Sequence, residues 1–121
     1  HALGAALRAD GVASYALVIA TSGPRDPALL LTALAAEAGW PVEVRTCEPR
    51  GHRVQTAARV AERLRAVVQA PLAVEPCATV EAALAAVVAA PLTLVTGSLY
   101  LVGEALAILA GEPRDPLFSG R

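Results

Sequence analysis

The sequence predicts an α/β fold in which a mainly parallel, doubly wound sheet is flanked by helices. Short apolar runs of strand length alternate along the chain with segments of helical periodicity. Capping residues precede several of the helical segments, and glycine or proline follows them. A length of 121 residues fits one domain with a single core. Because parallel strands need crossover connections, this alternation favours right-handed strand–helix–strand units.

Composition and the residues that begin or end helices predict the first elements. Residues 1–10 are rich in alanine and predict a helix that ends at Asp10-Gly11. Residues 14–20 form a continuous apolar run, which is typical of a strand covered on both faces. Asp26-Pro27 supplies an N-cap and a first-turn proline for a helix over 26–38, which Gly39 ends.

The middle of the chain predicts two more strands and a helix. Residues 41–46 alternate apolar and polar, as expected of an edge strand or a half-covered one. Residues 54–68 form an amphipathic helix whose arginines, Arg59, Arg63 and Arg65, lie on a solvated face. Residues 72–74 form a short strand.

The last elements end in an irregular tail. Thr79 caps a helix that carries Glu81 in its first turn and stops near Pro91. Residues 92–96 are the last strand, residues 98–110 are a helix, and residues 111–121 have no periodicity. In such a Rossmann-like sheet, ligands bind at the carboxyl ends of the strands. We therefore expect the loops 21–26, 47–53 and 96–98 to converge on the site.

Composition excludes several functions. The net charge of −1 gives no electrostatic case for binding nucleic acid or an anionic membrane. No lysine is present, so neither a lysine-containing phosphate loop nor Schiff-base chemistry can reside in this segment. No apolar run is long enough to cross a bilayer and no signal peptide is evident, so we expect a cytoplasmic protein.

The two cysteines, Cys47 and Cys77, do not make a disulfide framework, and we expect reduced, partly buried thiols. A metal site that combines them with His52 and His1 would lack paired ligand spacing. We assign no metal ligand.

The segment Thr96-Gly97-Ser98-Leu99-Tyr100-Leu101-Val102-Gly103-Glu104 joins the last strand to the last helix. Gly97 permits an unusual φ or a close backbone approach. Ser98 can cap the helix, and the free N–H groups behind it can bind an anion. A cap without a ligand explains the same serine.

This segment resembles a motif near the C-terminus of folylpolyglutamate synthases and bifunctional dihydrofolate synthases of the Mur ligase superfamily. The βα pattern of the whole chain is similar to the C-terminal domain of that superfamily. His1-Ala2-Leu3 is similar to the start of the helix that follows Asp-Gly-Ala-His-Asn-Pro in the family. The resemblance implies that residues 1–121 are the C-terminal domain of a larger ligase.

The resemblance also suggests site residues. Pro24-Arg25-Asp26 stands where the family has Asp-Lys-Asp, so Arg25 keeps the cation and Asp26 the second acid. We expect Thr96, Gly97, Ser98, Arg25, Asp26 and Tyr100 to bind substrate or nucleotide, and we assign no general base. Each has a structural alternative: Asp26 as a cap, Arg25 as an exposed cation and Tyr100 as a residue packed on the sheet. Arg50, His52 and Glu104 are expected to be exposed.

The implied activity is the ATP-dependent joining of L-glutamate to a folate or dihydropteroate carboxylate through an acyl phosphate. ATP and Mg²⁺ would be held mainly by an N-terminal ATPase domain of the same protein, so the chain alone should be inactive. Alternatives are another Mur-type amino-acid ligase and a non-catalytic Rossmann-like binding module. A flavodoxin-like or dinucleotide-binding domain fits less well, because no Gly-x-Gly-x-x-Gly follows the first strand.

Overall fold

A computed structural model describes residues 14–22, 25–50, 55–68, 72–87, 92–97 and 99–111, with the side chains of Leu99 and Tyr100 excepted. Strands and helices alternate throughout this part of the chain. The elements are β1 (Ala16–Ile19), α2 (Pro27–Ala38), β2 (Glu43–Thr46), α3 (Ala57–Arg65), β3 (Ala73–Pro76), α4 (Val80–Ala86), β4 (Thr93–Thr96) and α5 (Leu99–Ala110). The helix predicted over 1–10 and the tail beyond Gly111 lie outside the described residues.

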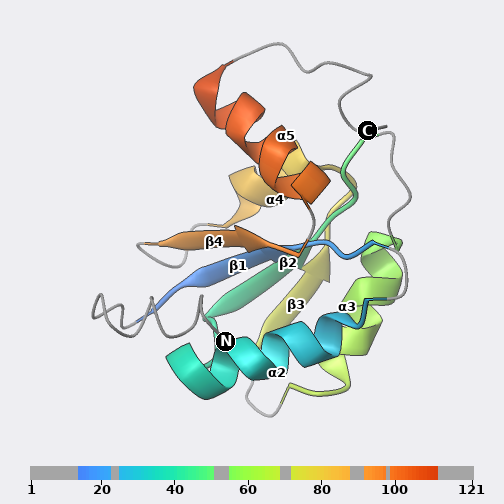
Figure 1. Ribbon diagram of the computed structural model, residues 1–121, viewed down its shortest axis with the longest axis vertical. Helices are drawn as coiled ribbons and strands as arrows, with labels where there is room; N and C mark the ends of the chain where they lie inside the picture. Colours follow the sequence, from blue (N-terminus) through green and yellow to red (C-terminus); the bar gives the residue numbers. More distant parts are fainter. Residues whose placement is uncertain are drawn as a thin grey trace.

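The sheet is parallel, with the strand order β3-β2-β1-β4. Helices α2 and α3 cover one face, and α4 and α5 cover the other (Figure 1). This is the doubly wound, Rossmann-like α/β architecture that the sequence predicts. Right-handed crossovers, the rule for parallel strands, require the helices to change face where the chain reverses direction across the sheet.

Local capping explains where the helices begin and end. Asp26 caps α2 through the Ala28 N–H, and Thr79 caps α4 through the Ala82 N–H, both at 3.0 Å. Thr56 accepts a 3.2 Å hydrogen bond from the Arg59 N–H at the start of α3. Helix α2 ends at Gly39, which has a positive φ of 82°. The predicted starts of α2 and α4 and the end of α2 are confirmed.

Strand β2 corrects part of the prediction for residues 41–46. It lies between β1 and β3, so it is not an edge strand. Its charged residues are accommodated on the face of α4 and α5, where Arg45 Nη2 lies 3.3 Å from Glu43 Oε1. The alternation therefore reflects an internal ion pair. The edge strands of the described sheet are β3 and β4. On β3 the Arg65 guanidinium donates to the Val74 carbonyl at 2.6 and 3.0 Å.

Two apolar clusters hold the layers together. The cluster facing α2 and α3 contains Tyr15, Leu17, Ile19, Leu31, Leu34, Val44, Val60, Ala61, Leu64 and Val74. The cluster facing α4 and α5 contains Val18, Ala20, Cys47, Val80, Ala83, Leu101 and Ala105. Alternate residues of β1 supply both clusters, as expected of a strand buried on both faces.

None of the helices within the described ranges is both long and apolar enough to cross a membrane.

Candidate functional site

The strand order creates a topological switch point between β1 and β4. From β1 the chain proceeds through β2 to β3, and then crosses to the opposite side of β1 to form β4. The loops that leave β1 and β4 lead to α2 and α5, which cover opposite faces of the sheet (Figure 1). Ligands of open α/β sheets bind at the carboxyl ends of the strands at such a point. Arg25 and Asp26 lie on one side of it, and Thr96 and Gly97 on the other.

Gly97 is required by the close approach of the β4–α5 turn to β1. Its φ is 112°, a backbone conformation that residues with a Cβ atom rarely adopt. A Cβ atom there would overlap the carbonyl oxygen of Ala20 and press on the Ile19 side chain. The prediction of an unusual φ and a close approach at Gly97 is confirmed. The contact brings the start of α5 against the end of β1.

Thr96 ends β4 as the register partner of Ile19, and it is half-buried. Its carbonyl accepts a 3.4 Å hydrogen bond from the Ala20 N–H, which continues the pairing of β1 and β4 to the switch point. Ser98 lies outside the described residues. Tyr100 belongs to the first turn of α5, and its side chain is outside them too.

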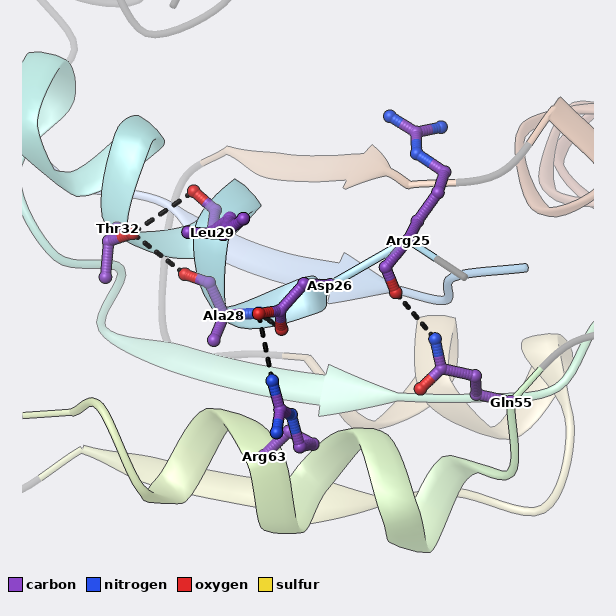
Figure 2. A network of polar contacts seen from close by, with 7 residues as sticks. All are labelled: Arg25, Asp26, Ala28, Leu29, Thr32, Gln55 and Arg63. Carbon is purple, nitrogen blue, oxygen red and sulfur yellow. Dashed lines mark hydrogen bonds and ion pairs between the residues drawn. The ribbon is translucent and has the colours of Figure 1, made fainter. Parts of the chain in front are cut away.

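Arg25 connects the two sides of the switch point. Its Nη1 donates to the Gly97 carbonyl at 3.3 Å, and its own carbonyl accepts a 2.7 Å hydrogen bond from Gln55 Nε2. The side chain is exposed and extends away from the Asp26–Arg63 pair (Figure 2). Because the backbone is tethered while the guanidinium stays accessible, Arg25 can hold an anion beside the start of α5.

Asp26 faces the other way. One carboxylate oxygen caps α2, and the other lies 2.9 Å from Arg63 Nη2 of α3 (Figure 2). The hydrogen bond from Arg63 lowers the pKa of Asp26, and the Ala28 N–H adds to the effect. Both oxygens are thus used within the protein, and the predicted capping role is the one the structure displays.

The sequence placed Thr21 in a loop expected at the site but did not single it out as a site residue. Thr21 follows β1 and is 1% exposed, and its hydroxyl has no hydrogen-bond partner within the described part of the chain. Its carbonyl accepts a 2.9 Å bond from the Gln55 N–H. A buried hydroxyl without a partner costs free energy, and its place at the switch point makes Thr21 a candidate ligand contact. The signal available in the sequence was a threonine directly after a buried apolar run.

The loop after β2 is fixed by two carboxylates. Glu48 Oε2 accepts a 2.8 Å hydrogen bond from the Ala57 N–H at the start of α3. Glu104 Oε1 accepts a 2.8 Å bond from the Arg50 N–H. The expectation that Glu104 is exposed is wrong, since it is 3% exposed on the inner face of α5. The hydrogen bond from the Arg50 N–H offsets part of the cost of burying the Glu104 carboxylate. Arg50 is exposed as predicted, and His52 lies outside the described residues.

A separate hollow of about 290 Å³ lies between α2 and α3. Its lining residues are Asp26, Ala28, Leu29, Thr32, Arg63, Ala66 and Val67. The charged pair at its rim is internally satisfied, and the remaining lining is mainly apolar. It is therefore not part of the candidate site at the switch point. Within the described ranges, no three potential ligand side chains gather as a metal site would require.

The chain matches no protein-family model, no curated protein and no solved structure.

Proposed function

We propose that this chain is the C-terminal domain of an ATP-dependent folate ligase of the folylpolyglutamate synthase and dihydrofolate synthase type. The parent protein would form an amide between L-glutamate and the carboxylate of a folate or dihydropteroate. One observation carries the proposal: the segment 96–104, which resembles the motif of that family, begins at the switch point of a parallel α/β sheet.

The chemistry at the switch point suits an anionic amino acid. Helix α5 has 12 residues, and the first N–H groups of a helix attract negative charge. The Arg25 guanidinium lies beside this turn, and the Thr21 hydroxyl is buried in the neighbouring loop. A carboxylate of glutamate fits a bidentate arginine and a helix N-terminus, and a hydroxyl supplies a further donor.

The same residues suit a nucleotide phosphate less completely. The described residues provide anion donors but no cluster of carboxylates for Mg²⁺, and the whole sequence lacks lysine. The family resemblance implies that ATP and Mg²⁺ are held mainly by an N-terminal ATPase domain. When bound, ATP supplies the phosphoryl group that activates the acceptor carboxylate. The residues of this chain then bind and orient glutamate for attack, which lowers the entropic part of the barrier.

Titration of the 121-residue chain with L-glutamate, followed by amide chemical shifts, tests the binding role. Arg25→Gln should weaken binding by about 10-fold or more, because a charge-assisted hydrogen bond contributes about 1.5–3 kcal/mol. Thr21→Val, which removes the hydroxyl and keeps the shape, should weaken it by a smaller factor. Arg59→Gln on the exposed face of α3 is the matched control and should leave binding unchanged. Equal affinities for all four proteins would contradict the assignment of the site.

Catalysis is tested separately in the full-length parent protein. Purified parent should add glutamate to dihydropteroate or folate with release of ADP, and Ser98→Ala should reduce the rate. The 121-residue chain alone should release no ADP. Glutamate ligation by the chain alone, or a parent protein that lacks the reaction, would refute the proposed activity.

A non-catalytic anion-binding module is the second candidate. The Arg25 guanidinium beside the start of α5 favours it, because these groups suffice to bind an anion without catalysis. The two candidates differ in the gene upstream of His1. A phosphate loop followed by Asp-Gly-Ala-His-Asn-Pro supports the ligase, and an unrelated domain supports the module.

A further inference from the structure

Cys47 and Cys77 occupy equivalent positions at the ends of neighbouring strands. Thr46 of β2 is the register partner of Pro76 of β3, and these strands run side by side (Figure 1). The Cys77 N–H donates to the Thr46 carbonyl at 2.8 Å, which completes the pairing of Thr46 with Pro76. Continuing this register by one residue places Cys47 opposite Cys77.

The two side chains also share a face of the sheet. Register partners in neighbouring strands point to the same side. Cys47 is fully buried in the cluster that faces α4 and α5, and Cys77, which is half-buried, packs against that cluster. Both thiols are free.

The backbone spacing is compatible with a bond between them. Neighbouring strands lie about 4.8 Å apart, which is within the Cα separation of about 4.4–6.8 Å found in disulfides. Disulfides bring the Cβ atoms to about 3.8 Å, so the two cysteine side chains must approach each other as the bond forms. A disulfide held away from its preferred geometry is more readily reduced. Both cysteines directly follow the last residue of a strand, where the backbone can yield most easily.

We propose that Cys47 and Cys77 form a reversible disulfide across β2 and β3 when the chain meets a low-molecular-weight disulfide such as oxidised glutathione. Cys77 is the entry point because its side chain is partly accessible. Its thiolate attacks the small disulfide, which forms a mixed disulfide on Cys77 and releases one small thiol. Cys47 then loses its proton to solvent, and its sulfur attacks Cys77 Sγ and releases the second small thiol. Two protein thiols are oxidised, and one small disulfide is reduced to two thiols.

Burial makes this exchange slow near neutral pH. It raises the pKa of Cys47 to about 12, with further contributions from the Cys77 thiol and then from Glu104, and it also raises the pKa of Cys77. Because only the thiolate reacts, the rate of disulfide formation should rise about tenfold per pH unit between about pH 7 and 8.5. The pair would therefore respond to sustained oxidation and not to brief exposure.

The bond would act on the loops around the candidate site. Cys47 begins the loop in which Glu48 caps α3 and the Arg50 N–H binds Glu104. Cys77 begins the connection from β3 to α4. A disulfide would join these two connections at the carboxyl edge of the sheet.

The test incubates the reduced chain with oxidised glutathione, blocks free thiols with an alkylating reagent, and measures the intact mass and a peptide map. The expected product has lost two hydrogens, about 2 Da, takes up no alkylating reagent and contains a Cys47–Cys77 cross-link. Dithiothreitol should restore both thiols. Cys47→Ala should stop at the mixed disulfide on Cys77, and Cys77→Ser should remain reduced.

Three results would overturn the proposal. One is accumulation of glutathione on Cys77 of the wild-type chain while Cys47 can still be alkylated after unfolding. Another is a covalent dimer through Cys77. The third is no oxidation of the folded chain under conditions in which the same chain oxidises in denaturant. Because the wild-type chain carries the decisive measurement, a variant that fails to fold does not weaken the test.

Discussion

Replacing Gly97 with alanine should destabilise the protein by about 4 kcal/mol, because two separate costs coincide at this residue. A φ of 112° for a residue with a Cβ costs about 1–3 kcal/mol. The new methyl group would also overlap the Ala20 carbonyl oxygen. This obstacle is main chain and cannot rotate away, and forced overpacking costs about 1–3 kcal/mol.

A loss of this size is large for a chain of 121 residues, whose total stability should be about 6–18 kcal/mol. At about 4 °C per kcal/mol, the midpoint of thermal unfolding should fall by about 15 °C. Urea denaturation followed by circular dichroism measures the free energy directly, and an unchanged slope would show that the unfolded state is unaltered.

Gly39→Ala is the matched control. Gly39 also has a positive φ, of 82°, but a Cβ atom there meets nothing within 4 Å. The control should therefore lose only the backbone cost of about 1–3 kcal/mol, without the cost of the overlap. If Gly97→Ala loses no more stability than Gly39→Ala, the close approach of the turn to β1 is not a real constraint.

Three further predictions concern single polar interactions. Burial raises the pKa of Tyr15 from 10.0 to about 12. The contribution of Tyr15 to the free energy of unfolding is therefore intact below about pH 10 and is lost as the pH rises through 12. In urea titrations at several pH values, Tyr15→Phe should remove this pH dependence. The hydrogen bond from Arg63 lowers the pKa of Asp26, so its contribution is present above about pH 4 and is lost as the pH falls further; Arg63→Gln should move acid unfolding to higher pH, and an unchanged midpoint would contradict this. Thr46→Val removes a buried 2.6 Å bond to the first turn of α3 and should cost about 1 kcal/mol, whereas Thr32→Val on the exposed side of α2 should cost only a few tenths.

Local signals in the sequence predicted the order and type of the described elements. Apolar runs marked the strands, and Asp26, Thr79 and Gly39 marked helix ends, because capping and strand burial depend on residues adjacent in sequence. The interior position of β2 was not accessible in this way. Strand order depends on the path of the crossovers, and the alternating charges of Glu43 and Arg45 suggested an edge when they form a pair inside the sheet.

In the candidate site, too, local requirements could be predicted from the sequence and long-range contacts could not. The unusual φ of Gly97 was predictable because it depends on the identity of that residue alone. The bridge from Arg25 to the Gly97 carbonyl spans 72 positions, and the bond from the Arg50 N–H to Glu104 spans 54. Neither follows from local spacing. Glu104 was misjudged because a lone acid in an apolar helix is usually solvated, and only the loop after β2 supplies the donor that allows its burial.

The unequal size of the two apolar clusters has a consequence for how the protein opens. The cluster facing α2 and α3 is built mainly from leucines, valines, Ile19 and Tyr15, whereas the cluster facing α4 and α5 consists largely of small side chains. Among the described residues, less apolar area is therefore withdrawn from water on the second side. The amides of α4 and α5 should exchange with deuterium through a low-energy partial opening, while those of β1 and α3 await global unfolding. The carboxyl edge at β4 would thus border the least stable layer of an otherwise firmly packed sheet.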